Sequence, residues 1–390
     1  MIQTVRRIAI VTVGRSDYQI YRSVFAALAL RADVEYGLIV GGEHLVAASG
    51  DGLVEIGRHG HLVIDKVEML LAGDDPSATS LSMAVGLGGF ARSFARYRPD
   101  LIIVLGDRFE MFAAAAAAVP LGIPLLHLHG GEVTEGAMDE RFRHAITKLS
   151  HLHCVATVLA GDRVRQMGEE PWRVHVTGAP GLDTALTVPP LDRGAFFSKL
   201  GMTDPGPFLL ATYHSVTNEP DPEGRQIAEL LLALRQVGLP VLFTTANADP
   251  GGHRINDLLW EEAKEAPHRV TVIRNLGELY GSAMVHASAM VGNSSSGIIE
   301  ACSYDLPVVN IGIRQAGRER SANVLDCACE YGEIVAALHH ALTPKSRAIA
   351  QAAPNIYGNG SAGTQIATIA AETPLDTRLR IKRFATWHQQ

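Results

Sequence analysis

The densest group of chemically versatile side chains in the sequence lies between residues 127 and 144. Two glycines follow His129, and Glu132 and Asp139 come after them. Glycines let a backbone turn tightly or approach a ligand closely, while carboxylates and imidazoles take up and release protons. The stretch directly follows an apolar run, so we predict an acid–base site rather than an ordinary surface loop. The spacing His127-x-His129 also suits a metal, but no third ligand accompanies it, and we expect no metal.

Two further charged groups follow apolar runs in the first half of the chain. Asp107 and Arg108 come after residues 101–105, and Arg15 comes after residues 8–13. An arginine at a helix start meets an anion easily, with help from exposed backbone N–H groups. The simpler interpretation is helix capping, by Asp107 in one place and by Ser16 or Asp17 in the other. For Asp107 taken alone, capping is the favoured interpretation.

The second half of the chain contains a run of small hydroxyl residues at 292–300. A strand, a turn with Ser294 and Ser295, and a helix would together form a phosphate cradle. The run has neither a Gly-Lys-Ser/Thr sequence nor a Gly-x-Ser-x-Gly elbow. Glu300 would accept two ribose hydroxyls, and Arg314 would supply positive charge for a diphosphate, together with the arginines that follow it. An ordinary helix start and a solvated loop are the alternatives.

The elements that must position these residues alternate between buried strands and amphipathic helices, which predicts parallel, doubly wound sheets. The strands expected in the first half are residues 8–13, 34–40, 101–105, 123–128 and 174–177. The helices expected there are residues 17–30, 77–97, 108–118, 139–148 and 159–167. The strands expected in the second half are residues 208–212, 241–245, 270–273, 289–291 and 308–311.

A turn-rich stretch at 178–190 separates the two halves and is the best boundary between domains. We therefore predict an α/β protein with two Rossmann-like domains, residues 1–180 and 181–372, facing a cleft. Pro220 and Pro222 open a long helix that ends near Val237. The tail is expected to form helices at 362–371 and 375–390, and the second of these would pack back on the first domain.

The composition excludes several classes of protein. The chain has 390 residues, of which 47% are hydrophobic and 19% charged, and a net charge of −7. Such a chain buries large cores and lacks the basic surface of a nucleic-acid-binding protein. No apolar run suits a membrane span, and four cysteines without a pairing pattern favour a reducing cytoplasm. An anionic ligand would therefore need a local cluster of cations.

Taken together, these motifs resemble one family, the hydrolysing UDP-N-acetylglucosamine 2-epimerases of sialic-acid and legionaminic-acid biosynthesis. The resemblance covers nearly the whole chain in order and is carried by residues 14–18, 106–110, 129–140, 143–151, 178–183, 292–297 and 314–319. It implies the two-domain GT-B fold, a UDP- or GDP-linked 2-acetamido sugar as substrate, no cofactor, and a homodimer or homotetramer. The expected products are the nucleotide diphosphate and the free 2-epimer.

The resemblance also implies roles for individual residues. Asp107 and Asp139 match the catalytic carboxylates, and Arg108 would lie beside the reacting sugar or phosphate. The nucleotide diphosphate site would comprise Arg15, His214, Asn247, Ser294, Ser295, Glu300 and Arg314. From the residues alone, His214 at a strand end is more often structural.

One position departs from the family pattern. Where the sialic-acid branch is expected to carry a glutamate before the two glycines, this chain has His129, and Glu132 follows them. The third catalytic group is therefore either His129 or Glu132, and the change is consistent with a 2,4-diacetamido-trideoxy sugar. Three alternatives remain: a non-hydrolysing UDP-N-acetylglucosamine 2-epimerase, a GT-B glycosyltransferase and a non-catalytic nucleotide-sugar sensor. Fold alone separates none of them.

Overall fold

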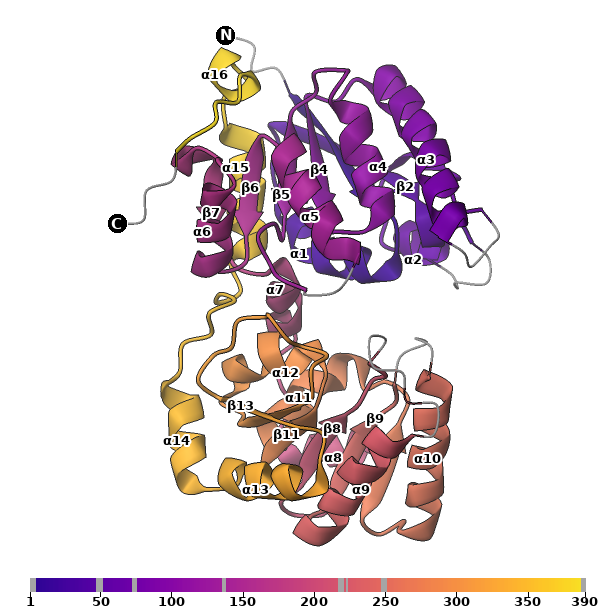
Figure 1. Cartoon of the computed structure of the whole chain (residues 1–390), viewed down its shortest axis with the longest axis vertical. Coiled ribbons are helices and arrows are strands. Elements are labelled where there is room, and N and C mark those ends of the chain that lie inside the picture. The colour runs from indigo at the N-terminus through magenta and orange to yellow at the C-terminus, as the bar shows by residue number, and fades with distance from the viewer. Residues whose placement is uncertain are drawn as a thin grey trace. The chain divides into compact units, whose positions relative to one another are not determined.

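A computed structural model describes residues 5–46, 52–71, 76–134, 138–216, 221, 224–246 and 251–386. The chain divides into two compact units. The first comprises residues 1–184 and 357–390, and the second comprises residues 185–356. Each unit is built on its own parallel sheet with helices between the strands (Figure 1), as the alternating sequence pattern predicts.

The first unit contains a seven-stranded parallel sheet in the order β3-β2-β1-β4-β5-β6-β7. Its strands are β1 (Arg6–Thr12), β2 (Val34–Gly41), β3 (Val63–Val67), β4 (Leu101–Leu105), β5 (Leu125–Leu128), β6 (Leu152–Val155) and β7 (Val174–Val176). Its helices are α1 (Arg15–Ala29), α2 (Gly52–Arg58), α3 (Pro76–Tyr97), α4 (Phe109–Ala118), α5 (Met138–Leu149), α6 (Val158–Gln166), α7 (Pro180–Thr187), α15 (Ala362–Glu372) and α16 (Thr377–Arg380). The unit boundary falls within α7.

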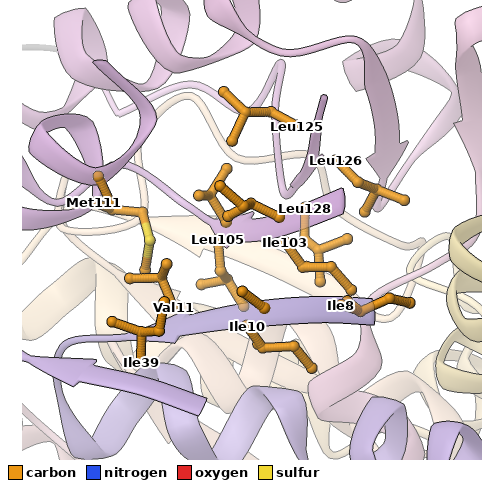
Figure 2. Close-up of a cluster of buried hydrophobic side chains, with 14 of the residues drawn as sticks. Ile8, Ile10, Val11, Ile39, Ile103, Leu105, Met111, Leu125, Leu126 and Leu128 are labelled. Carbon is orange, nitrogen blue, oxygen red and sulfur yellow. The ribbon is translucent and has the colours of Figure 1, made fainter. Parts of the chain in front are cut away.

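The core of this unit is an apolar sheet covered on both faces. Because parallel crossovers are right-handed, reversing the direction of strand succession moves the helix to the opposite face. Helices α3, α4 and α5 therefore lie on one face, and α1 and α15 pack together on the other (Figure 1). Figure 2 shows side chains of β1, β4 and β5 in this core, among them Ile10, Ile103 and Leu126, all fully buried. Burial on both faces explains the uninterrupted apolar strand sequences.

The second unit contains a six-stranded parallel sheet in the order β10-β9-β8-β11-β12-β13. Its strands are β8 (Leu209–Thr212), β9 (Val241–Thr244), β10 (Val270–Ile273), β11 (Ala289–Gly292), β12 (Val308–Ile311) and β13 (Val324–Cys327). Its helices are α8 (Arg193–Leu200), α9 (Arg225–Val237), α10 (Gly252–Glu265), α11 (Tyr280–His286), α12 (Ser295–Ile299), α13 (Tyr331–Ala341) and α14 (Pro344–Ala352). Pro220 and Pro222, expected to open α9, lie outside the described residues.

The C-terminal segment differs from the predicted domains. Residues 357–372 were expected in the second domain but belong to the first unit. Two backbone N–H groups at the start of α15, those of Ala362 and Gly363, donate to the Asp183 carboxylate at 3.1 and 2.6 Å. A Cβ at Gly363 would lie 2.5 Å from the backbone of Ser23, so α15 approaches α1 very closely. These contacts place α15 on the first sheet.

The predicted helix at 375–390 is wrong. Within the described residues 375–386, only α16 forms, and the chain beyond it is irregular. The buried Arg173 guanidinium donates hydrogen bonds to the backbone carbonyls of Arg378, Leu379 and Ile381 at 2.8–3.0 Å. These three contacts, all from one guanidinium, hold the tail on the first unit, and the described residues after α16 do not continue the helix.

Sequence patterning missed three strands, β3, β6 and β13. The edge strands β3 and β13 each carry charged residues and are only partly buried, so they lack an uninterrupted apolar run. In β6, the buried His153 interrupts the pattern and is compensated by the Glu169 carboxylate, 3.1 Å from its Nε2. Within the described part of the chain, none of the helices combines the length and the apolarity that crossing a membrane requires.

Candidate functional site

Both sheets reverse their strand order at one point, and most of the predicted site residues follow strands at these two points. In the first unit the reversal falls between β1 and β4, and in the second it falls between β8 and β11. Open α/β sheets bind ligands beyond the carboxyl ends of the strands at such a reversal. Arg15 follows β1, Asp107 and Arg108 follow β4, His214 follows β8, and Ser294 follows β11.

Arg143 on α5 connects the acid–base groups of the first unit. Its side chain is 3% exposed and forms an ion pair with the Asp107 carboxylate. The same guanidinium donates to the backbone carbonyl of Glu132 and to the Thr134 hydroxyl, each at 2.8 Å, and to the Glu140 carboxylate at 2.5 Å. Asp107 does not cap α4, because the N-cap position is Arg108. The capping interpretation of Asp107 is therefore wrong.

The two predicted catalytic carboxylates have different surroundings. Asp107 is paired with the Arg143 guanidinium, whereas burial and the nearby negative charge of Asp107 raise the pKa of Asp139 above its ordinary value. Two carboxyl groups whose surroundings differ in this way can act as base and acid at the same pH.

His129 and Glu132 form a hydrogen-bonded pair across the glycine turn. The imidazole Nδ1 lies 2.6 Å from Glu132 Oε1, and both side chains are less than one-fifth exposed. His129 has a φ of 61°, a left-handed conformation that is costly for any residue except glycine and is concentrated at functional sites. Gly131 also has positive φ, and a Cβ there would lie 2.1 Å from the Ala160 carbonyl oxygen. The turn therefore requires a glycine at 131 and imposes strain at 129.

Arg108 lies at the same edge of the sheet, between two carboxylates. Its Nη2 is 2.9 Å from Glu43 Oε1 and 2.8 Å from Glu110 Oε1. Burial opposes its charge, but Glu110 and Glu43 together raise the pKa of the guanidinium above its ordinary value. The cation is therefore fixed in place before any ligand binds. Arg15 has a different environment: its side chain is 63% exposed and 3.8 Å from Glu55.

Asp17 anchors the turn between β1 and α1. The helix begins at Arg15, two residues earlier than predicted, and its N-cap Gly14 makes no side-chain cap. The Asp17 carboxylate instead accepts the Val13 N–H at 2.7 Å. Burial raises the pKa of Asp17 to about 6, against the opposing effect of this hydrogen bond. Asp17 thus shapes the turn from which Arg15 projects.

His127, the other histidine of the His127-x-His129 spacing, is structural. His127 is fully buried on β5, with Nε2 2.8 Å from the Gly106 carbonyl and Nδ1 3.2 Å from the Thr147 hydroxyl. Burial lowers the pKa of His127 to about 3, so the ring is neutral and shapes the turn before Asp107. A search of the described residues finds no group of three or more His, Cys, Asp or Glu residues that could hold a metal ion.

In the second unit, Asn293 connects three strand ends. Its fully buried side chain accepts the His214 N–H at 2.7 Å and donates to the His214 carbonyl at 2.8 Å. Its own carbonyl accepts from Arg314 Nη1 at 3.1 Å and from Gln315 Nε2 at 3.0 Å. A Cβ at Gly292 would lie 1.9 Å from the Thr212 carbonyl oxygen, so β8 and β11 touch here. His214 and Arg314 are thereby fixed on either side of one residue.

The hydroxyl-rich turn follows directly. Ser294 is the N-cap of α12 and accepts the Ser296 N–H at 3.3 Å, and Ser295 is the first helical residue. Glu300 ends this short helix. Burial raises the pKa of Glu300 to about 7, and a hydrogen bond from Ser296 opposes the rise. Burial, together with Glu300, raises the pKa of Tyr280 to about 12, and Tyr280 contacts Thr212, Ser294 and Ser296.

The structure thus gathers the predicted residues into two sets. The first unit holds Asp107, Arg108, His129, Glu132 and Asp139, with Arg15 nearby on α1. The second holds His214, Ser294, Ser295, Glu300 and Arg314, while Asn247 lies outside the described residues.

Sequence reasoning missed the connecting roles of Arg143 and Asn293. Both stand inside motifs that the sequence singled out, but nothing in their spacing reveals which distant segments they join.

Comparison with known proteins yields consistent matches. The family model described as UDP-N-acetylglucosamine 2-epimerase matches residues 26–371. The hydrolysing UDP-N,N'-diacetylbacillosamine 2-epimerase of Legionella pneumophila is 35% identical over 376 residues, which is 96% of this chain and 98% of that protein. The hydrolysing GDP/UDP-N,N'-diacetylbacillosamine 2-epimerase of Campylobacter jejuni is also 35% identical, over 82% of this chain and 84% of its own.

Solved structures agree with this fold. The UDP-GlcNAc 2-epimerase of Neisseria meningitidis bound to UDP-GlcNAc aligns with a TM-score of 0.77 over 94% of this chain and 100% of its own, at 18% identity. The Methanocaldococcus jannaschii UDP-GlcNAc 2-epimerase in complex with UDP-GlcNAc and UDP aligns with a TM-score of 0.74 over 93% of this chain and 99% of its own, at 15% identity.

Proposed function

Because the chain belongs to the UDP-N-acetylglucosamine 2-epimerase family and is a hydrolysing nucleotide-sugar 2-epimerase, we propose that its substrate is a UDP-linked 2,4-diacetamido-2,4,6-trideoxyglucose. Two relatives at 35% identity carry names of this substrate type. The presence of His129 where the sialic-acid branch is expected to carry a glutamate agrees with a sugar other than UDP-N-acetylglucosamine. The products are UDP and the free 2-epimer, a sugar that feeds the synthesis of legionaminic-type acids.

The observation that carries this proposal is the concentration of acid–base groups in the first unit. Asp107, Asp139 and the His129–Glu132 pair all lie near Arg143 or its partners at one edge of the sheet. A sensor or a glycosyltransferase would bind a nucleotide sugar without needing several proton carriers. A 2-epimerase needs them, because one proton must leave C2 and another must arrive on its opposite face.

We propose that the reaction begins with elimination. The C2–H bond of a pyranose is not acidic, because no carbonyl is adjacent, so the proton leaves only as the C1–O bond to the diphosphate breaks. Asp107, held by Arg143, takes the C2 proton. UDP departs with the C1–O electron pair and leaves a glycal. Arg314 and the Ser294–Ser295 turn in the second unit stabilise the charge that develops on the leaving diphosphate.

Hydration of the glycal then gives the product. Asp139, whose carboxyl group is held toward its protonated form, donates a proton to C2 from the opposite face. Water adds to C1, and its proton goes to His129, which Glu132 orients through Nδ1. This assignment uses both members of the pair, with the imidazole as the base and the carboxylate as its partner, as in other His–carboxylate arrangements. Exchange with solvent restores all three groups.

A product assay tests the proposal. The protein is incubated in D2O with UDP- and GDP-linked diacetamido-trideoxyglucose and with UDP-N-acetylglucosamine, and ¹H and ³¹P NMR follow the sugars and phosphates. We expect UDP, the free 2-epimer with one deuterium at C2, and the highest kcat/KM for the UDP-linked diacetamido sugar. A nucleotide-linked epimer would indicate the non-hydrolysing reaction, and release of UDP without any 2-epimer would refute epimerisation.

Two variants assign the chemistry to the first unit. Asp107→Asn should abolish turnover while UDP still binds, because the proposed nucleotide-binding residues other than Arg15 lie in the second unit. Asp162→Asn, which alters an aspartate paired with Arg165 on α6, serves as the matched control and should behave like the wild type. A loss of UDP affinity in Asp107→Asn would make Asp107 a binding residue instead.

We also propose a cytoplasmic homodimer or homotetramer. All four cysteines are free, two of them buried, as suits a reducing compartment. Light scattering after size-exclusion chromatography measures the oligomeric state, and a monomer at micromolar concentration would refute that part of the proposal.

A further inference from the structure

We infer that Arg143 is a positioning residue of the epimerase reaction, because one guanidinium holds both Asp107 and the loop that carries the His129–Glu132 pair. This inference rests on the proposed function, since it concerns the alignment of groups assigned there to proton transfer. Arg143 itself touches no reacting atom in this scheme. It acts through the residues that it holds.

The hydrogen bonds of Arg143 join three separate segments of the chain. Nη2 contacts the Asp107 carboxylate, after β4, and the Thr134 hydroxyl, after the glycine turn. Nη1 contacts the Glu132 carbonyl in that turn and the Glu140 carboxylate on α5. The four N–H bonds of the two Nη atoms match four acceptors, so the guanidinium has a partner for every terminal hydrogen. The end of β4, the glycine turn and helix α5 are therefore all hydrogen-bonded to the Arg143 guanidinium.

The Glu140 contact makes this arrangement rigid. The Glu140 carboxylate also accepts the Thr134 N–H at 2.7 Å and lies 3.1 Å from His144 Nε2. Burial opposes its charge, but the Thr134 N–H and Arg143 lower the pKa of Glu140 below its ordinary value. Glu140 therefore stays ionised and fixes Arg143 from the helix side, while Thr134 is held by both residues. The loop from 129 to 134 consequently cannot move independently of Arg143.

A second buried arginine shows what a merely structural role looks like. Arg173 is fully buried in the same unit and donates to the backbone carbonyls of His151, Arg378, Leu379 and Ile381 at 2.8–3.1 Å. Its carboxylate partner is Glu170, three residues away. Arg143 differs because it contacts Asp107, whose side chain is 29% exposed. Arg143 thus links the interior of the unit to a carboxylate that a ligand can reach.

The position requires an arginine rather than a simple cation. A lysine offers three N–H donors from a single point and cannot match four acceptors arranged around a plane. Arg143→Lys keeps the charge but loses at least one of the four bonds. Arg143→Met keeps much of the side-chain volume and removes both charge and donors. Comparing the two variants therefore distinguishes the effect of the positive charge at position 143 from the effect of aligning the four acceptors.

The test measures kcat, KM and UDP affinity of Arg143→Lys and Arg143→Met with the preferred sugar. We expect kcat to fall roughly 100-fold or more in Arg143→Met, as small misplacements of catalytic groups cost about that much, and less in Arg143→Lys. KM and the Kd for UDP should change less than threefold, because the partners of Arg143 among the described residues, Asp107, Glu132, Thr134 and Glu140, are not proposed nucleotide-binding residues. Arg141→Met, an exposed position on the same helix, is the matched control and should resemble the wild type.

A structural comparator completes the design. Arg173→Lys should lower Tm while kcat per folded molecule stays within threefold of the wild type. If Arg143→Met does not fold, Arg143→Lys carries the test, and a kcat within threefold of the wild type overturns the inference. A fall in kcat that merely follows the loss of folded protein or of UDP binding also overturns it. If the wild type makes no free 2-epimer from any sugar, the proposed function fails, and this inference fails with it.

Discussion

Asn293→Ala probes how the second unit holds its nucleotide-binding residues. In the wild type the buried Asn293 amide satisfies both backbone groups of His214, with contacts of 2.7 and 2.8 Å. Alanine removes both of these hydrogen bonds from the backbone at the end of β8. The contacts of the Asn293 carbonyl with Arg314 and Gln315 belong to the backbone and are retained. The substitution therefore isolates the clamp on His214.

The size of the effect follows from the environment. A hydrogen bond contributes about 1 kcal/mol net, but a buried backbone group left without a partner costs about 1–3 kcal/mol. Asn293 is fully buried, so water does not easily replace the amide. Losing these two hydrogen bonds should lower the free energy of unfolding by roughly 2–4 kcal/mol. If half of that loss also weakens the nucleotide complex, UDP affinity falls about 5-fold to 30-fold, since each 1.4 kcal/mol is about a factor of ten.

Urea unfolding measures the free energy of unfolding, and isothermal titration calorimetry measures the affinity for UDP. Asn275→Ala is the control, because Asn275 is exposed and its amide oxygen accepts only a local N–H, that of Gly277, at 2.8 Å. We expect the control to change stability by less than about 0.5 kcal/mol and to leave UDP affinity unchanged. An Asn293→Ala protein that is as stable as the control would show that His214 is not held by this amide, and would refute the reasoning.

Three further predictions concern single side chains. His129→Gly should keep the unfolding free energy within about 1 kcal/mol of the wild type, because glycine relieves the strain of the positive φ. The same variant should lower kcat at least about 100-fold. Unfolding curves measure the first effect and steady-state kinetics the second, and a kcat near the wild-type value would show that His129 is not catalytic. Glu300, with a pKa raised from 4.5 to about 7 by burial, stabilises the fold fully below pH 4.5 and loses that stabilisation as the pH rises through about 7. Glu300→Gln should abolish this part of the pH dependence of unfolding, and an unchanged slope would contradict the assignment. Burial opposes the charge of Glu169, but His153, Lys148 and Lys382 lower its pKa from 4.5 to about 2, so its stabilisation is present above pH 4.5 and is lost as the pH falls toward about 2. Glu169→Gln should lower the free energy of unfolding by roughly 3 kcal/mol at pH 7 and should reduce its dependence on pH below 4.5, as measured by urea unfolding. A decrease below about 0.5 kcal/mol would show that the ion cluster contributes little to stability.

The sequence predicted the central strands well, because burial on both faces selects uninterrupted apolar runs. Residues 101–105 and 308–311 were expected as strands and form the central strands β4 and β12 with the same bounds. Two edge strands, β3 and β13, escaped prediction, since only part of each is buried and charged residues such as Asp65 and Lys66 are tolerated there. The C-terminal tail escaped for another reason. Its local sequence favours a helix. The Arg173 guanidinium, about 200 residues away in the sequence, donates to backbone carbonyls of the tail and holds the tail on the first unit.

The candidate site was predictable only in part. Residues that do chemistry stand at strand ends, and the sequence marks those ends, so Asp107, His129 and Ser294 were found. The residues that hold them are not marked. Arg143 reaches Asp107 across 36 positions, and Asn293 reaches His214 across 79. Such contacts depend on which strands are neighbours, and the alternation of strands and helices does not determine strand order.

Asn293 and Arg143 differ in charge, and the difference matches the groups that each residue contacts. Asn293 faces one peptide unit, whose N–H and carbonyl require one acceptor and one donor, and a neutral amide offers both at no cost in buried charge. Arg143 faces carboxylates, and a neutral amide there would leave Asp107 and Glu140 without a compensating charge. A buried cation is expensive on its own, but here every terminal N–H has a partner. The cost of burying the guanidinium is thus offset by the Asp107 and Glu140 carboxylates together, so the contacts that compensate the buried charge are the same contacts that hold the proposed base in place.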